Sequence, residues 1–212
     1  AIVAAQYGDT IWVAQGTYLP TTGTNRFISF TLKNGVQMFG GFAGTESSLD
    51  ERDWEANPTV LSGDIGVPGD STDNSYNVVF CNLADSTTVL DGFVITGGNA
   101  DNDSSGPTTT RPKSGGGLHL VGSSQAQDTR PVIRNCRFIG NHARFNGGGM
   151  FVRTVLGAGA TPTLINCEFR DNSAARGGGV YREGGSVMFE MHITKCKFIN
   201  NQAFHGGGLY VI

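Results

Sequence analysis

Long apolar segments of the kind that cross a membrane as a helix are missing from this sequence of 212 residues. Only 16% of the residues are charged, and no motif of a nucleic-acid-binding domain is present, so we expect no nucleic-acid partner. No segment rich in proline or serine divides the chain, which favours one domain over two. What the sequence has in excess is glycine, at 32 residues.

The glycines belong to a repeat that occupies residues 131–212. Three segments align as NCRFIGNHARFNGGGMFV, NCEFRDNSAARGGGVYR and KCKFINNQAFHGGGLYV, and their cysteines lie 31 and 29 residues apart. The repeated positions are Cys136, Cys167, Cys196, Phe138, Phe169, Phe198, Asn141, Asn172 and Asn201. Upstream, the segment LDGFVITGGNA aligns with the first repeat and places Phe93 at the cysteine position and Ile95 at the phenylalanine position. A period near 30 residues indicates stacked identical units.

Each unit is predicted to consist of short strands. The cysteine and the phenylalanine lie two residues apart with a charged residue between them, which is the period of a strand with one buried face. A triple glycine in every unit disfavours a helix, since each glycine costs about 1 kcal/mol in a helix interior. The sequence therefore predicts an all-β fold, a right-handed single-stranded parallel β-helix with coils of about 30 residues in its C-terminal half.

In such a solenoid the repeated residues have structural roles. Cysteine and phenylalanine at a fixed phase form inward ladders, asparagine at the corner bonds backbone groups and its stacked neighbours and tolerates φ > 0, and glycine permits sharp bends and close coil contact. The three cysteines are expected to be buried free thiols, because stacked parallel side chains are poorly oriented for a disulfide, although the expected spacing is within bridging range.

We expect a single β-helix domain over residues 1–212 that is a fragment of a longer protein, whose remainder is then a partner of this segment. Residues 1–9 are predicted to be the end of a short N-terminal capping helix, residues 10–99 irregular first coils, and residues 100–130 long loops around one glycine strand. The three regular repeats fill residues 131–212.

Charge is distributed unevenly along the chain. Residues 1–110 hold 3 Lys/Arg and 13 Asp/Glu, a net charge of −10, whereas residues 111–212 hold 12 and 5, a net charge of +7. The acidic segment at residues 43–57 lacks the spacing of a calcium loop and is predicted to be a solvated loop anchored by Trp54. Asp101 and Asp103 are weak calcium candidates; otherwise no metal or cofactor is expected.

Two outward features could carry function. Glu168 and Asp171 form the one carboxylate pair of the regular coils, and Glu168 shares its phase with Arg137 and Lys197. Hydrolysis of a glycoside needs two carboxyl groups about 5–9.5 Å apart. Alternating charges on exposed parallel strands are also ordinary cross-strand pairs, and pairing is the favoured interpretation.

The second feature is a column of aromatic side chains. If the aliphatic residues of the glycine strands face inward, then His119, Phe151, Tyr181 and Tyr210 face outward and stack one coil apart. Flat rings on a rigid sheet suit stacking against sugars, with Arg137 and Lys197 as neighbours for an acidic glycan. The alternative, that a loop or further sequence covers the rings, is equally well supported.

The repeats resemble those of the chlamydial polymorphic outer membrane proteins, which share a Phe-x-x-Asn and Gly-Gly-Ala-Ile pattern. The N-terminal segments GDTIWVAQGTYLPT and FGGFAGTESS are similar to those of large secreted β-helix proteins of Bacteroidetes, which often carry a type IX secretion sorting domain. This resemblance implies the pectate-lyase-like β-helix superfold and a secreted or bacterial cell-surface location. It transfers no catalytic residue, because the shared positions are glycines, asparagines and inward apolar residues.

The sequence thus predicts a non-catalytic exported or cell-surface β-helix, acting as a stalk, an adhesin or a glycan-binding surface. Its expected partners are a polysaccharide or another cell-surface protein, and it is not expected to span a membrane itself. The alternative is a polysaccharide lyase or glycoside hydrolase of the same superfold.

Overall fold

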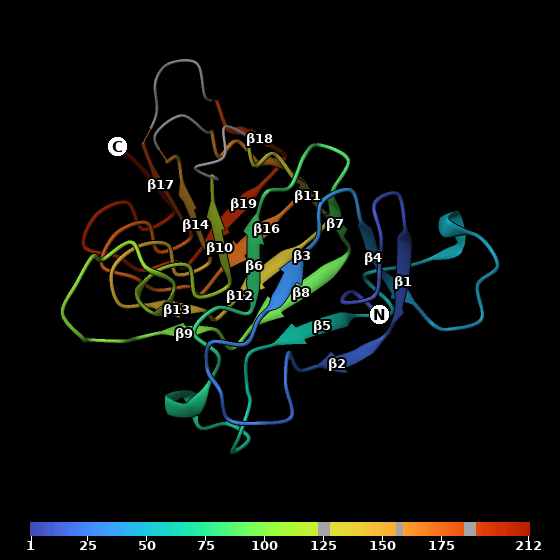
Figure 1. Ribbon diagram of the computed structural model, residues 1–212, viewed down its shortest axis with the longest axis horizontal. Helices are drawn as coiled ribbons and strands as arrows, with labels where there is room; N and C mark the ends of the chain where they lie inside the picture. Colours follow the sequence, from blue (N-terminus) through green and yellow to red (C-terminus); the bar gives the residue numbers. More distant parts are fainter. Residues whose placement is uncertain (123–127, 156–158, 185–189) are drawn as a thin grey trace.

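A computed structural model describes residues 1–122, 128–155, 159–184 and 190–212. Its strands form three six-stranded sheets, and every strand pairing within these sheets is parallel. Each of six coils contributes one strand to each sheet, so that the chain winds around a common axis (Figure 1). This is the parallel β-helix predicted from the repeats.

Sheet A contains the first strand of each coil. In spatial order it consists of β1 (Thr10–Ala14), β4 (Gln37–Phe42), β7 (Val89–Asp91), β11 (Val132–Arg134), β15 (Thr163–Ile165) and β18 (His192–Thr194).

Sheet B contains the second strand of each coil, which holds the repeated phenylalanine in the regular repeats. It consists of β2 (Gly16–Tyr18), β5 (Thr59–Ser62), β8 (Phe93–Thr96), β12 (Arg137–Ile139), β16 (Glu168–Arg170) and β19 (Lys197–Ile199).

Sheet C contains the third strand of each coil, which follows the triple glycine in the regular repeats. It consists of β3 (Phe30–Leu32), β6 (Val79–Asn82), β10 (Leu118–Val121), β14 (Met150–Arg153), β17 (Val180–Glu183) and β20 (Leu209–Val211). The remaining elements are a two-stranded sheet, β9 (Asn99–Ala100) with β13 (His142–Ala143), and the short 3-10 helices η1 (Leu49–Glu51), η2 (Ser71–Asp73) and η3 (Arg111–Lys113).

The core is built from the predicted ladders. Phe138 stacks on Phe169 with ring centroids 4.8 Å apart, and Phe169 stacks on Phe198 at 5.2 Å. Ile95 lies beside Phe138 in the register of sheet B, as the alignment of the upstream segment predicts. Because each ring is held between its equivalents in neighbouring coils, a period of about 30 residues is what keeps the core continuous.

The corner asparagines bond one another along the axis. The Asn141 Nδ2 donates to Asn172 Oδ1 at 3.1 Å, and Asn172 Nδ2 donates to Asn201 Oδ1 at 2.9 Å. The same Oδ1 of Asn172 also accepts the backbone N–H of Asn141 at 3.0 Å. The predicted amide ladder is thereby confirmed, and it satisfies polar groups that the stacking of coils would otherwise bury unpaired.

The left-handed backbone conformation that the sequence predicts for the ladder asparagines occurs at other residues. The ladder asparagines have ordinary backbone angles; positive φ values occur one residue earlier, as at Asp171 with φ 54°, and at the corner before each cysteine, as at Asn166 with φ 52°. The prediction was wrong because the ladder residue already lies past the bend, where its side chain must point along the axis to reach its partners.

Glycine is required where coils touch. A Cβ at Gly149 would lie 2.6 Å from the carbonyl oxygen of Gly179 in the next coil, too close for any side chain. The close approach predicted for the triple glycines is confirmed.

The predicted capping helix is absent, since the described residues contain no α-helix. Residues 1–9 make two turns, in which the Ala5 N–H donates to the Ala1 carbonyl at 3.2 Å and the Asp9 N–H donates to the Gln6 carbonyl at 3.0 Å. Ala5 and Ile2 nevertheless pack against the end of the core. So short a segment, with Gly8 in left-handed backbone after it, cannot offset the cost of helix nucleation.

Within residues 100–130, for which long loops are predicted, the structure contains η3 and β10. Part of the second loop, residues 123–127, lies outside the described residues.

Candidate functional site

The outward aromatic column exists, but most of it is covered. Ring centroids are 4.8 Å apart for His119 and Phe151, 5.6 Å for Phe151 and Tyr181, and 5.7 Å for Tyr181 and Tyr210. Phe151 has 0% of its surface exposed, His119 and Tyr181 are also buried, and Tyr210 is half-buried. The first three rings are therefore not a platform for sugars, and the interpretation in which they are covered is correct.

The cover comes from the same coils. Ser114, Asn146, Arg176 and His205 form a column joined by parallel bridges. The glycine after each packs against the backbone or Cβ at the start of the sheet C strand that carries the aromatic residue. A Cβ at Gly177 would lie 2.8 Å from Tyr181 Cβ, for example. The His119 ring nitrogen Nδ1 lies 2.9 Å from the Ser114 carbonyl, and burial lowers the pKa of His119 to about 4. Neutral and enclosed, His119 is a packing residue.

The charged column on sheet B is present in the predicted register. Arg137 pairs with Glu168, and Glu168 pairs with Lys197, on β12, β16 and β19. The Glu168 carboxylate accepts a hydrogen bond of 2.6 Å from Arg170 Nε. That bond, followed by the charges of Arg170, Lys197 and Arg137, lowers the pKa of Glu168. Glu168 is thus held as an anion.

Asp171 does not join Glu168 in a common cleft. It lies at the corner after β16, in left-handed backbone, and is not among the residues that line the groove around Glu168. The Glu168–Asp171 pair is therefore not assembled around this groove, whose second carboxylate is that of Glu55.

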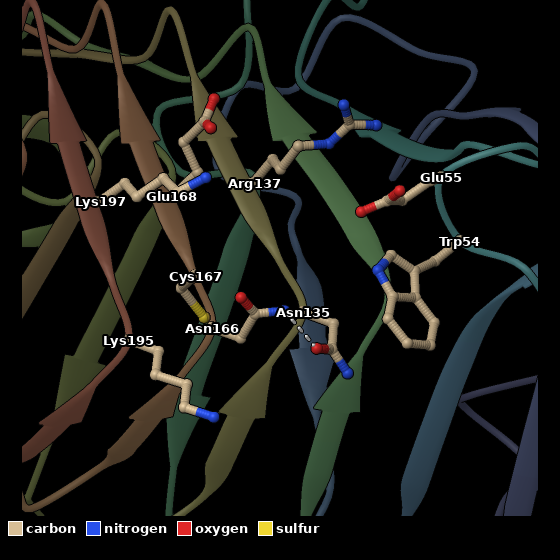
Figure 2. A pocket seen from close by; sticks show the side chains of 9 residues that line it. All are labelled: Trp54, Glu55, Asn135, Arg137, Asn166, Cys167, Glu168, Lys195 and Lys197. Atoms are coloured by element: carbon tan, nitrogen blue, oxygen red, sulfur yellow. Dashed lines mark hydrogen bonds between the residues drawn. The ribbon is translucent and has the colours of Figure 1, made fainter.

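A groove runs across the charged column on sheet B. Figure 2 shows Lys197, Glu168 and Arg137 side by side on neighbouring strands, with Trp54 and Glu55 beyond Arg137. Its volume is about 310 Å³. The lining residues are Trp54, Glu55, Asn135, Arg137, Asn166, Cys167, Glu168, Lys195 and Lys197.

The floor of the groove includes two corner amides. Asn166 Nδ2 donates to Asn135 Oδ1 at 2.8 Å, and both residues have φ near 52° (Figure 2). The Asn135 amide is engaged at both ends, because its Nδ2 donates to Asp91, so the amide oxygen of Asn166 is the group that the floor offers to a ligand. The neighbouring Lys195 is placed by the same kind of corner, at φ 55°. The groove therefore combines an indole ring, fixed amides and three cationic side chains.

The wall of the groove is the acidic loop of residues 43–57, held down by an ion cluster. The side chain of Arg52 is 8% exposed, and its Nη2 lies 2.7 Å from Asp91 Oδ2. The same Asp91 accepts from Arg134 Nε at 2.6 Å and from Asn135 Nδ2 at 2.8 Å. The Arg52 guanidinium also lies 5.0 Å from the centre of the Trp54 ring. Trp54 anchors the loop as predicted, and Arg52 does so as well.

Arg137, Glu168 and Lys197 could be predicted from the sequence to lie together, whereas the position of Trp54 and Glu55 beside them could not. No periodic relation links residue 54 to residue 137, because the loop interrupts the repeat. The one available signal was an arginine and a tryptophan within an otherwise acidic segment.

Of the two calcium candidates, Asp101 forms an ion pair and Asp103 is exposed to solvent. Asp101 Oδ1 lies 2.7 Å from Arg26 Nη2, and its Oδ2 accepts from Asn99 at 3.1 Å. Asp103 is exposed. Within the described parts of the chain, no group of three or more His, Cys, Asp or Glu side chains could hold a metal ion.

All four cysteines are free, as predicted for the three ladder cysteines, although Cys196 is half-buried and not fully buried as expected. Burial raises the pKa of the Cys81 and Cys136 thiols well above their usual range. A hydrogen bond with the Cys167 thiol lowers the pKa of Cys196 to about 7, and Cys196 is half-buried.

We therefore expect Cys196 to react first with an aromatic disulfide reagent such as dithionitrobenzoate. The thiolate is the reactive form, so the rate should rise with pH through a midpoint near 7. Stopped-flow absorbance checks this, and Cys196→Ser should abolish the fast phase. Equal rates at Cys81 and Cys196 would contradict it.

No family model, no curated protein and no solved structure matches this chain. None of the described segments is a helix with the length and hydrophobicity needed to cross a membrane.

Proposed function

We propose that this chain is a non-catalytic β-helix segment of an exported or cell-surface protein, and that it binds an acidic glycan in the groove on sheet B. The observation that carries the proposal is the groove itself, in which Trp54 faces a column containing Arg137 and Lys197. Adhesion to a polysaccharide, or the display of such a binding surface on a stalk, is the corresponding biological role.

The chemistry of the groove suits a uronate-type polymer. An indole offers an apolar surface for the C–H face of a sugar ring, and the amide oxygen of Asn166 suits a hydroxyl group. Arg137, Lys195 and Lys197 supply positive charge, while Glu168 is already engaged by Arg170. The groove lies on a rigid sheet, so its side chains need little ordering on binding.

The state of Glu168 favours binding over hydrolysis. A general acid needs a raised pKa, whereas the pKa of Glu168 is lowered by its hydrogen bond from Arg170. A lyase would instead use one of the cationic side chains as a base. The experiment below distinguishes this alternative from binding without turnover.

Export is proposed on the resemblance of the repeats to chlamydial outer membrane proteins and of the N-terminal segments to secreted Bacteroidetes proteins. The pectate-lyase-like superfamily is the proposed relationship for the same reason.

Calorimetric titration with polygalacturonate tests the proposal. Wild-type protein should bind, and Arg137→Ala with Lys197→Ala should weaken binding by at least about thirtyfold, because each of the two charge-assisted contacts contributes about 1–3 kcal/mol. Arg144→Ala, which removes an arginine outside the groove, is the matched control and should bind normally.

The same mixtures should be followed for unsaturated products and new reducing ends. We expect neither. Turnover that is lost on changing Arg137 or Lys197 would replace the binding proposal with a lyase, and unchanged binding by the double variant would exclude this groove.

A further inference from the structure

A second surface lies away from the groove, on the turns that connect sheet B to the triple glycines. Here the residues that follow the ladder asparagines form columns across the last three coils: His142, Ser173 and Gln202 are joined by parallel bridges, and Arg144, Ala175 and Phe204 occupy the same position of their repeats. Phe204 is 89% exposed, the highest value among the large hydrophobic side chains of the described residues. The ring lies in the last of the six coils and borders two hollows together with residues of the two preceding coils.

Phe204 is the ridge between two hollows. The first has a volume of about 390 Å³ and a floor of alanine methyl groups, contributed by Ala174, Ala175 and Ala203. The second, of about 230 Å³, is lined by Phe145, Asn146, Ala175, Arg176, Phe204 and His205. Phe204 and Ala175 line both, so a ligand in one hollow lies directly beside the other.

The surface is cationic as well as apolar. Arg144 borders the first hollow and Arg176 the second, and both are exposed. Among the described residues, no aspartate or glutamate lines either hollow. Asp101, whose charge acts on His142, is bonded to Arg26. The surface is thus complementary to a ligand that combines apolar groups with negative charge.

We propose that these two hollows bind an extended acidic segment of a partner protein. Alternate side chains of an extended peptide lie about 7 Å apart on one face, so two apolar side chains can enter the hollows on either side of Phe204. Carboxylates two residues before and two residues after this apolar pair lie on the same face of the peptide and reach Arg144 and Arg176 at the rims, where they form charge-assisted bonds.

A peptide fits better than a sugar polymer here. The first hollow has polar side chains in its lining, but three alanine methyl groups and the phenyl ring of Phe204 give it an apolar part that matches an aliphatic side chain better than a hydroxylated sugar ring. The groove on sheet B, with its fixed amides, has the opposite character. The two surfaces therefore bind different classes of ligand, and this inference is independent of the glycan proposal.

Fluorescence anisotropy tests it with a labelled pool of eight-residue peptides that carry leucine, valine or phenylalanine at positions 3 and 5, glutamate at positions 1 and 7, and serine at the other positions, so that the apolar and acidic side chains share one face. The wild-type chain should bind this pool, and a pool with lysine in place of glutamate should bind at least tenfold more weakly. Phe204→Ala and Arg144→Glu should each weaken binding of the glutamate pool by tenfold or more.

Arg130→Glu is the control, since it makes the same change of charge at an exposed arginine outside both hollows and should leave binding unchanged. All three substituted residues are exposed, so each variant should keep the thermal midpoint of the wild type. Absence of binding, equal binding of the two pools, or full binding by Phe204→Ala would overturn the proposal. Loss of polygalacturonate binding in Arg144→Glu, with Arg137→Ala unaffected, would assign the hollows to a glycan instead.

Discussion

Replacing Asp91 by alanine is expected to lower the free energy of unfolding by about 3–5 kcal/mol, the cost of leaving buried charges without their partner. The side chain of Asp91 is 1% exposed, and its Oδ2 lies 2.7 Å from Arg52 and 2.6 Å from Arg134. Without the carboxylate, the guanidinium of Arg52 stays buried beside Phe39 and Trp54 with no anion to neutralise it.

Urea unfolding followed by circular dichroism measures the effect, and Asp103→Ala, at an exposed aspartate, should change stability by less than about 0.5 kcal/mol. Since Arg52 holds the loop that carries Trp54, Asp91→Ala should also weaken glycan binding in the groove on sheet B. A loss of less than about 1 kcal/mol would show that the cluster does not anchor the loop.

Replacing Phe169 by alanine should cost about 3–5 kcal/mol of stability, because it removes a fully buried ring. The ring stacks at 4.8 Å on Phe138 and at 5.2 Å on Phe198, so the cavity opens between two rigid coils that cannot collapse into it. The effect should be larger than for an isolated aromatic residue at a loop.

The repeat supplies a matched control for Phe169. Phe204→Ala makes the same chemical change in the next coil at a side chain that is 89% exposed, and it should alter stability by less than about 0.5 kcal/mol. Equal urea midpoints for the two variants would contradict the inward ladder.

The ladders of stacked side chains could be predicted from the sequence because stacking requires equivalent residues to recur at a constant spacing. A residue such as Phe169 can touch its equivalents only if its spacing is kept from coil to coil, so the physical requirement is written directly into the period. The same holds for the amide ladder through Asn172. Alternation also placed Phe151 and Tyr181 on the outer side of sheet C.

Whether an outward side chain is exposed could not be predicted in this way. The burial of Phe151 depends on the path of the glycine segment that follows Asn146, and glycine leaves that path open. The groove on sheet B depends on Arg52 and Asp91, which lie 39 residues apart and outside any repeat. Contacts between an interrupted loop and the coils have no periodic signature.

The residues that recur in every repeat have structural roles, whereas the residues that vary between repeats form the two surfaces. In sheet B these are Arg137, Glu168 and Lys197, and on the turns they are Arg144 and Phe204. The coils place such residues at about 4.8 Å intervals along a rigid axis, which suits ligands that are themselves extended polymers.

A crystal structure with a bound oligogalacturonate tests the central claim most directly. The sugar should lie in the groove on sheet B with a ring against Trp54, carboxylates within hydrogen-bond distance of Arg137 and Lys197, and every glycosidic linkage intact. An oligosaccharide seated on the turns around Phe204, or cleaved product in the groove, would contradict the account.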